Sequence, residues 1–147
     1  MAINVRKAQA TRSGSRMMWK ASVNAICARA HGTGATSANS RTADGFLLFA
    51  SEIETLEALA RDAKIQMLPE EHRRNVTVQG VPLNHLVGRR FWVGETLLEA
   101  TRLSTPCRHI EEILGKAVFD PLINRSGLNC RILRGGVVRV GDAVREA

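Results

Sequence analysis

The residue best suited to chemistry in this sequence is Cys107, which follows Thr105 and Pro106 at the end of a strand-like run. Thr105 suits the N-cap of a helix, and Pro106 suits the first helical position, where its missing N–H is not needed. This spacing predicts Cys107 in the first helical turn, among unpaired backbone N–H groups and beside Arg108. Both features favour the thiolate, the form of cysteine that attacks electrophiles and binds metals. The alternative is a purely structural role as a small apolar side chain.

A group of basic and amide side chains is the second candidate for chemistry. Arg73, Arg74 and Asn75 directly precede a predicted strand, and side chains at strand ends can converge on a pocket. The planar guanidinium of arginine donates two parallel hydrogen bonds to a phosphate, so these residues are a candidate anion clamp. Arg102 precedes Cys107 by five positions and could share its site. A solvated basic turn is the alternative interpretation.

Other arrangements of cysteine and histidine carry little chemical signal. His109 lies two residues after Cys107, which on a helix turns its side chain about 200° away and argues against a catalytic dyad. The remaining histidines have no metal-ligand spacing relative to a cysteine: His31, His72 and His85. We interpret Cys27 and Cys130 as packing residues and expect no zinc site. The sequence contains no phosphate-binding loop and no dinucleotide glycine fingerprint.

Several motifs occur together, in order, over about residues 50–145. They are Arg-Arg-Asn-Val-Thr-Val-Gln-Gly-Val at 73–81, Leu-Val-Gly-Arg-Arg-Phe-Trp-Val-Gly at 86–94, Glu-Ala-Thr-Arg at 99–102, Pro-Cys at 106–107, Asn-Arg-Ser-Gly-Leu at 124–128 and Gly-Gly-Val-Val-Arg-Val-Gly-Asp at 135–142. The set resembles the signature of the MOSC domain, the C-terminal module of molybdenum cofactor sulfurases, which also occurs as a stand-alone protein.

The resemblance implies two roles for Cys107: it carries sulfur as a persulfide, or it ligates the molybdenum of the pterin cofactor. Both roles need a thiolate, and molybdenum is expected to favour a soft sulfur ligand. Molybdopterin carries a phosphate, which fits an arginine clamp. In the Arg-x-Gly loop, glycine permits close backbone approach to a ligand. The cofactor-binding residues that the resemblance implies are Arg73, Arg74, Asn75, Thr101, Arg102, Arg125 and Gly127.

Three functions follow from the resemblance and from Cys107. The first is a sulfur carrier, in the class of sulfur transferases, with a sulfur donor or an acceptor molybdoenzyme as its partner. The second is a molybdenum cofactor-dependent oxidoreductase that reduces N-hydroxylated compounds. The third is a non-catalytic binding module that keeps the barrel but has a degenerate site. A small anionic or pterin ligand is expected as a partner. Relatives usually carry a Gly-Asp-Arg-His-like segment in the part corresponding to 31–45, and its absence here favours the first and third functions.

Length and cysteine usage limit the domain organisation and the compartment. A chain of 147 residues suits one domain, expected over 21–147, after a basic disordered tail at 1–20. No apolar run approaches the roughly 20 residues needed to span a bilayer. Three cysteines form no disulfide framework, which indicates a reducing compartment and a cytoplasmic protein. A basic, acid-poor start is also typical of a transit peptide, which would direct the protein to an organellar matrix.

The net charge of +7 is concentrated at the start of the chain. Residues 1–20 contain five cations and no acid, which leaves +2 for the rest. The chain has no tyrosine and only 4% aromatic residues, so platforms for base stacking are scarce. Composition therefore argues against nucleic acid as a partner.

The elements that must position these residues are mainly short strands broken by glycines. We expect strands at 22–28, 46–50, 76–79, 90–93, 96–103, 130–133 and 137–140, and a loop at 31–45. A helix is expected at 52–63 behind a Ser51–Glu54 capping box, a second from Pro106 to Leu114, and a short one at Asp120. This pattern predicts a mixed α/β, mainly β fold, a compact curved sheet or barrel with two or three short helices. The resemblance implies the same β-barrel, similar to that of pyruvate kinase.

Overall fold

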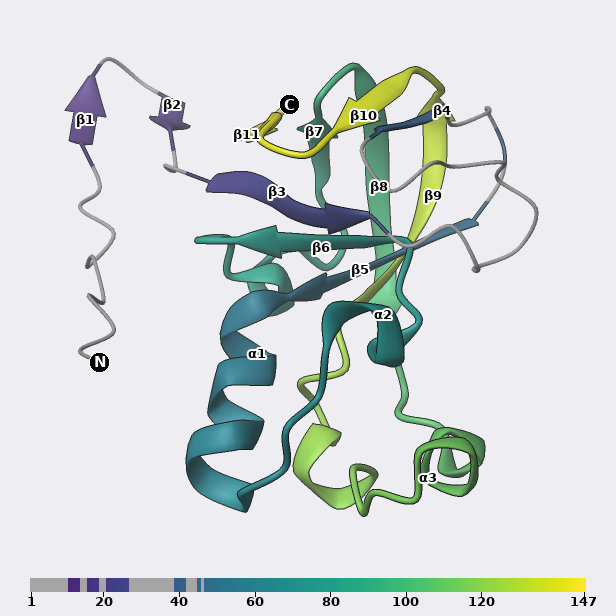
Figure 1. Cartoon of the computed structure of the whole chain (residues 1–147). Helices are drawn as coiled ribbons and strands as arrows, with labels where there is room; N and C mark the ends of the chain where they lie inside the picture. The colour runs from purple at the N-terminus through teal and green to yellow at the C-terminus, as the bar shows by residue number, and fades with distance from the viewer. Residues whose placement is uncertain (1–10, 14–15, 19–20, 27–38, 42–44, 46) are drawn as a thin grey trace.

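The computed structural model describes residues 11–13, 16–18, 21–26, 39–41, 45 and 47–147 (Figure 1). Seven strands close into a barrel in the order β11-β3-β6-β5-β9-β8-β7. The barrel strands are β3 (Ala21–Ile26), β5 (Leu47–Glu52), β6 (Val76–Gln79), β7 (Arg90–Val93), β8 (Thr96–Leu103), β9 (Leu128–Arg134) and β11 (Ala143–Glu146). Strands β5 and β6 run parallel, and the other neighbours are antiparallel. The predicted mixed, mainly β barrel is confirmed.

Strand positions follow the sequence pattern closely where glycines punctuate short β-type runs. The predicted strands at 76–79, 90–93 and 96–103 coincide with β6, β7 and β8. The strands expected at 46–50 and 130–133 are longer in the structure, as β5 and β9, and that at 22–28 begins one residue earlier, as β3. Strand β11 was not predicted, although it closes the barrel by pairing with both β3 and β7.

Two short pairings lie outside the barrel. Strand β1 (Thr11–Ser13) pairs with β2 (Arg16–Met18), and β4 (Asn39–Arg41) pairs with β10 (Val137–Arg139). The expectation of no regular structure before residue 20 is therefore wrong for β1 and β2, and the expected loop at 31–45 contains β4. Strand β4 reads Asn-Ser-Arg, which has no apolar alternation, so only its pairing with β10 reveals it. That the tail is dispensable stays a prediction.

The interior of the barrel is filled by alternate residues of its strands. Fully buried side chains include Val78 on β6, Phe91 on β7, Leu98 on β8, and Leu128 and Ile132 on β9. Because side chains alternate across a strand, their sequence neighbours point to the outer surface. The outer face of the barrel therefore carries polar and charged residues together with apolar ones such as Trp92 and Leu97.

A second apolar cluster lies under the helices, which gather at the end of the barrel where β8 leads into α3 (Figure 1). The helical segments are α1 (Ile53–Ala58), the π-helical η1 (Leu59–Ala63), α2 (Pro69–His72), the 3-10 helix η2 (Leu83–Leu86), α3 (Arg108–Leu114) and the 3-10 helix η3 (Asp120–Leu122). The cluster consists of Leu56, Leu59, Met67, Val118 and Leu122.

In the described part of the chain, no helix has the length and apolar character needed to cross a membrane.

The expected helix at 52–63 is present as α1 and η1, but its capping box is not. Glu52 is the N-cap and makes no side-chain capping hydrogen bond. Ser51 Oγ instead lies 3.3 Å from Thr77 Oγ1, and Glu54 accepts a hydrogen bond from Gly80 N at 2.7 Å. The Ser51 contact therefore joins β5 to β6, and Glu54 ties the helix to the loop that follows β6. The predicted end of α3 at Gly115 and the short helix at Asp120 are confirmed.

Candidate functional site

Cys107 lies at the junction between β8 and α3, with its side chain exposed. The prediction that it occupies the first turn is wrong, because α3 begins at Arg108 and Cys107 is itself the N-cap, with φ −116° and ψ 125°. Its carbonyl accepts the first helical bond, from Ile110 N at 3.1 Å, while its thiol makes no capping bond. The thiol is therefore free to meet a partner from solvent.

Arg74 is the cation that the structure brings to Cys107. Burial lowers the pKa of the Arg74 guanidinium, and Coulombic attraction to Cys107 opposes this effect, which indicates that the two groups lie near each other. An arginine stays cationic at neutral pH even when its pKa is lowered. Arg74 Nη2 donates to Ser126 Oγ at 2.6 Å, and the guanidinium lies 5.7 Å from the ring centroid of Phe49. These contacts fix a charged group in position before any ligand arrives.

Three buried nitrogen atoms near this position have no hydrogen-bond partner among the described residues. They are Arg74 Nε and both ring nitrogens of His72, a side chain that is 0% exposed. Burial, with the neighbouring positive charge of Arg74 acting in the same direction, lowers the pKa of His72 to about 3, so the imidazole is neutral at physiological pH. Buried polar groups in native proteins are usually paired, so unpaired nitrogens mark a place where a further polar group would be accommodated.

His72 was not predicted, because no local pattern distinguishes it from a surface histidine. It ends α2, a turn of helix that begins at Pro69 and is stabilised by Glu71, which accepts a hydrogen bond from Leu68 N at 2.8 Å. Lys116 donates to the same carboxylate at 2.8 Å, which lowers the pKa of Glu71 and joins α2 to the loop after α3. Proline at the first helical position followed by two glutamates was the available signal for this helix.

Asn75 supports the site through the backbone. Its side chain is buried, and Oδ1 accepts a hydrogen bond from Phe49 N at 2.8 Å. This bond joins the start of β6 to β5 and holds the ring that lies under Arg74. A direct contact of Asn75 with a ligand stays a prediction.

Thr101 and Arg102 lie at a bulge of β8, on the outer surface beside Asn129 of β9. Thr101 Oγ1 donates to the carbonyl of Asn129 at 2.8 Å. In the amide orientation that satisfies both its atoms, Asn129 accepts from Arg102 Nη2 at 3.2 Å and donates to Ser104 Oγ at 3.2 Å. Arg102 is thus held on the part of β8 that leads to Cys107.

Among the described residues, neither Arg73 nor Arg125 shows the interaction with Cys107 that Arg74 shows. Arg73 is exposed at the C-cap of α2, with φ 57°, and makes no ion pair within the described residues. Arg125 lines a separate cleft of about 150 Å³, together with Glu52, Glu54, Thr55, Ala58, Asn84 and Gly127. Burial raises the pKa of Glu52 there, an effect opposed by the N–H of Leu83. Neither Cys107 nor Arg74 lines this cleft, so the arginines do not all converge on one pocket.

Gly127 is required for packing between two chain segments. It has φ +94°, and a Cβ at this position would collide with the carbonyl oxygen of Ala50. The structure shows a close approach of Gly127 to strand β5, and a close approach to a ligand stays a prediction. The loop before β9, which carries Ser126, is held against the barrel by this contact.

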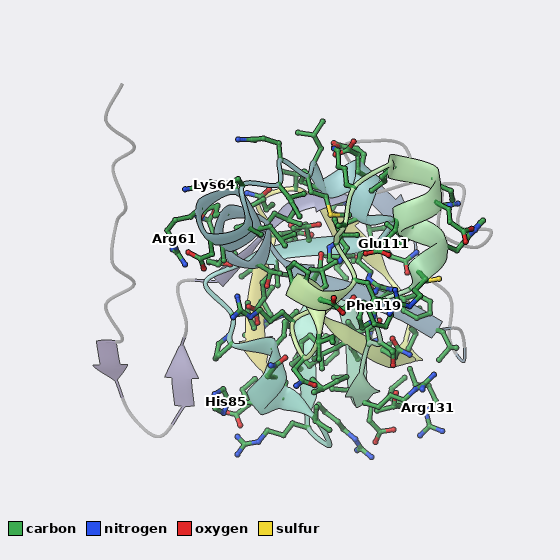
Figure 2. All side chains as sticks on the ribbon, turned by 90° about the horizontal axis from the view of Figure 1, so that it is seen from below. Arg61, Lys64, His85, Glu111, Phe119 and Arg131 are labelled. Carbon is green, nitrogen blue, oxygen red and sulfur yellow. The ribbon has the colours of Figure 1, made fainter. Side chains whose placement is uncertain are left out.

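Arg108, the neighbour of Cys107 in sequence, is engaged with α3 and the loop after it. Its guanidinium lies 4.2 Å from the ring centroid of Phe119 and 3.8 Å from the carboxylate of Glu111. Glu111 also accepts a hydrogen bond from Phe119 N at 2.8 Å, and the two residues lie side by side in Figure 2. The contribution that we expected Arg108 to make to the Cys107 thiolate stays a prediction.

The other described cysteine and histidine residues include a buried packing residue and an exposed surface histidine. Cys130 is buried in the barrel, and burial raises the pKa of its thiol to about 12, as suits a packing residue. Cys27 and His31 lie outside the described residues. His109 Nδ1 lies 3.1 Å from Glu112 on the exposed surface of α3. Within the described residues, no three or more His, Cys, Asp or Glu side chains are grouped as metal ligands.

Comparisons with known structures reveal similar barrels at low sequence identity. YiiM from Geobacillus stearothermophilus is 17% identical with a TM-score of 0.61, over 68% of this chain and 53% of that protein. The YuaD protein from Bacillus subtilis is 23% identical with a TM-score of 0.60, over 68% of this chain and 64% of that protein. YiiM from Escherichia coli is 15% identical with a TM-score of 0.66, over 90% of this chain and 70% of that protein.

The similar solved structures establish the fold of this chain, and the match to a family model establishes its family. The chain spans less than two thirds of the length of the first two structures. No curated protein matches the sequence. The model of the MOSC domain matches residues 41–145, which include every motif quoted above and the site around Cys107. The chain therefore belongs to the MOSC domain family.

Proposed function

We propose that this protein carries sulfur as a persulfide on Cys107, with Arg74 stabilising the negative charge of the outer sulfur. The proposal is supported by an exposed thiol and by a mostly buried guanidinium that interacts electrostatically with it and whose Nε has no partner among the described residues. A persulfide is anionic, and a cation fixed in advance stabilises it without rearrangement. The exposed thiol leaves both a donor and an acceptor free to approach.

The loading step is balanced and needs no oxidant. The Cys107 thiolate attacks the outer sulfur of a donor persulfide, forming a new S–S bond on Cys107. The S–S bond of the donor breaks, and its inner sulfur leaves as a thiolate that takes up the proton of the former persulfide. Delivery to an acceptor thiol runs through the same exchange in reverse. His72 is neutral at physiological pH, so Arg74 supplies the positive charge.

A second candidate is binding of the molybdenum cofactor, with which the MOSC family is associated. The donor set fits such a group, because it offers one exposed soft sulfur and one buried guanidinium with an unpartnered nitrogen. Cys107 would hold the metal, and Arg74 would contact an anionic part of the pterin. The cofactor would supply two-electron redox chemistry when bound, as a reductase of N-hydroxylated compounds requires.

Persulfide loading and metal analysis test the two candidates together. The protein is incubated with glutathione persulfide, and each cysteine peptide is examined by mass spectrometry in wild type and Cys107→Ser. The sulfur-carrier proposal expects one added sulfur on Cys107, none on Cys130, and none in the variant. Molybdenum at near one atom per chain after expression in a molybdenum-replete host, lost in Cys107→Ser, would support the cofactor instead. No added sulfur and no metal would overturn both and leave a non-catalytic binding module.

A further inference from the structure

Two rows of side chains cross the outer surface of neighbouring barrel strands. In the first row, register places Arg145, Trp92, Leu97 and Arg134 side by side on β11, β7, β8 and β9. In the second row, Arg90, Glu99, Arg131 and Leu47 lie side by side on β7, β8, β9 and β5. The core contains Phe91, Leu98, Ile132 and Val144, so their sequence neighbours in the two rows point outward. Arg134 follows a register shift between β8 and β9, and its contact with the Trp92 ring places it on the same outer surface. We call these eight residues the arginine face.

The arginine face is strongly positive. It contains four arginines and one glutamate. Arg131 lies 2.7 Å from the Glu99 carboxylate and Arg90 lies 3.4 Å from it, so one anion is shared between two cations. The other two, Arg134 and Arg145, lie 5.9 and 5.7 Å from the ring centroid of Trp92. The side chains of Arg90 and Arg131 are 62% and 55% exposed, which leaves them accessible to a partner.

Apolar groups lie among these charges. Leu47 is 60% exposed, and Trp92 and Leu97 are half-buried at the centre of the first row. An apolar centre with tryptophan, surrounded by arginines, has the composition of residues that dominate binding energy at protein–protein interfaces. Nucleic acid fits less well, because a single strand needs successive stacking rings and Trp92 is the only aromatic side chain of this face.

The arginine face is continuous with the thiol along β8. Leu97 and Glu99 belong to the face, Arg102 follows on the outer surface beside Asn129, and the chain then reaches Cys107. A partner that extends from the face along β8 would reach Cys107. This continuity connects a binding surface with the place where sulfur would be exchanged.

We propose that the arginine face docks an acidic surface of a partner protein that exchanges sulfur with Cys107. The proposal rests on the proposed function for the identity of the partner, while the docking itself rests on charge complementarity. Negative side chains of the partner pair with Arg131, Arg134 and Arg145, and an apolar side chain packs on Trp92. Glu99 pairs with Arg90 and Arg131, so it weakens the attraction of the arginine face for an acidic partner.

Binding of a labelled acidic peptide tests the docking surface directly. The probe is a fluorescent peptide of about ten residues, rich in glutamate with a central leucine, measured by anisotropy on the full chain. We expect Trp92→Ala and the double variant Arg131→Ala/Arg134→Ala to weaken binding about tenfold each. Glu99→Gln should tighten binding, because it removes the only negative charge of the face.

The matched control is Arg61→Ala. Arg61 is exposed and forms an ion pair with Asp62 at 2.7 Å, the same distance as that between Arg131 and Glu99. Figure 2 shows Arg61 and Arg131 on different sides of the molecule. Binding should be unchanged in Arg61→Ala. Equal losses in this control and in the Arg131→Ala/Arg134→Ala variant, or tighter binding of a thymidine oligonucleotide of equal charge, would overturn the proposal.

A second measurement separates docking from sulfur chemistry. Cys107→Ser should bind the acidic peptide as wild type does, because Cys107 lies outside the arginine face. The same peptide with a terminal cysteine persulfide should load Cys107 faster than a neutral peptide of equal length, and lose this advantage in the double variant. Binding without loading would overturn the proposed function and leave the docking surface intact, whereas loading at equal rates from both peptides would overturn the docking.

Discussion

Arg74 Nη2 donates a 2.6 Å hydrogen bond to Ser126 Oγ, although 52 positions separate the two residues in the chain. Arg74 lies just before β6 and Ser126 just before β9, so the bond joins two loops at the end of the barrel that carries Cys107. It fixes a charged group whose Nε has no partner among the described residues. The candidate site therefore depends on the fixed position of the Arg74 guanidinium and not on several arginines converging on one pocket.

An anion that binds Arg74 should stabilise the folded protein. Millimolar phosphate or sulfate is expected to raise the melting temperature, because a ligand that binds only the folded state stabilises it. The increase should shrink in Arg74→Ala, which removes the fixed cation. Scanning fluorimetry with and without the anion measures the effect.

Arg139→Ala is the control for this prediction. Arg139 is exposed and lies 3.5 Å from Glu95, so its loss removes the same charge from a surface ion pair. The anion effect should survive there. Equal responses in the two variants would indicate nonspecific screening and contradict an anion site at Arg74.

His72 should make the protein less stable in acid. An unfolded histidine binds a proton below about pH 6.5, whereas burial lowers the pKa of folded His72 to about 3. The unfolded state therefore binds more protons between these values, and the free energy of unfolding falls as the pH falls, by about 1 kcal/mol per pH unit. Urea unfolding of wild type and His72→Leu at pH 7 and pH 4.5 measures the difference.

The leucine variant should lose less stability on acidification than wild type. Replacing an unpaired buried imidazole by an apolar side chain also removes two unsatisfied nitrogens, so the variant should be no less stable than wild type near pH 4.5. Identical pH slopes in the two proteins would contradict a buried neutral His72.

Gly127→Ala should destabilise the fold strongly. The added Cβ meets the carbonyl of Ala50 at a residue with φ +94°, so both steric overlap and backbone strain oppose it. A loss of about 3 kcal/mol or more is expected. Gly115→Ala is the control, because its φ of +62° is also left-handed but nothing lies within 4 Å of the added atom. That change should cost only about 1 kcal/mol. Similar losses in both variants would show that Gly127 does not pack against β5 as described.

Cys107 should alkylate much faster than Cys130 in the folded protein. The first thiol is exposed, and burial both shields the second and raises its pKa to about 12. Iodoacetamide labelling at neutral pH, followed peptide by peptide, should give a fast phase on Cys107 that disappears in Cys107→Ser. A faster reaction of Cys130 or Cys27 would move the reactive site away from the β8–α3 junction.

The parts of the fold that could be predicted are those set by local patterns. Strands β6, β7 and β8 are short β-type runs punctuated by glycines, and their bounds follow from the sequence. Strand β11 has one buried apolar residue, Val144, and forms only because β3 and β7 pair with it. Closure of the barrel therefore depends on long-range pairing that no local pattern reveals.

Only part of the candidate site could be predicted, because some of its features are local and others depend on long-range contacts. Cys107 and Arg74 have local signals, in a Thr-Pro-Cys turn and a basic strand start. The capping position of Cys107, the contact of Arg74 with Ser126 and the burial of His72 depend on how loops meet at the end of the barrel. Arg125 and Gly127 have motif positions but lie at a different cleft. Sequence spacing therefore indicates which residues are candidates, and the tertiary structure decides which of them meet.

The rate at which Cys107 accepts sulfur is the most direct test of whether Arg74 stabilises sulfur on Cys107. The second-order rate constant for loading by glutathione persulfide is measured at neutral pH in wild type, Arg74→Met, Arg74→Lys and Arg139→Ala, with circular dichroism as the check of folding. We predict about a tenfold slower reaction in Arg74→Met, which removes roughly 1.4 kcal/mol of charge stabilisation. Arg74→Lys should recover part of the rate, and Arg139→Ala should match wild type. Equal rate constants in wild type and a folded Arg74→Met variant would contradict the role of Arg74 in stabilising sulfur on Cys107.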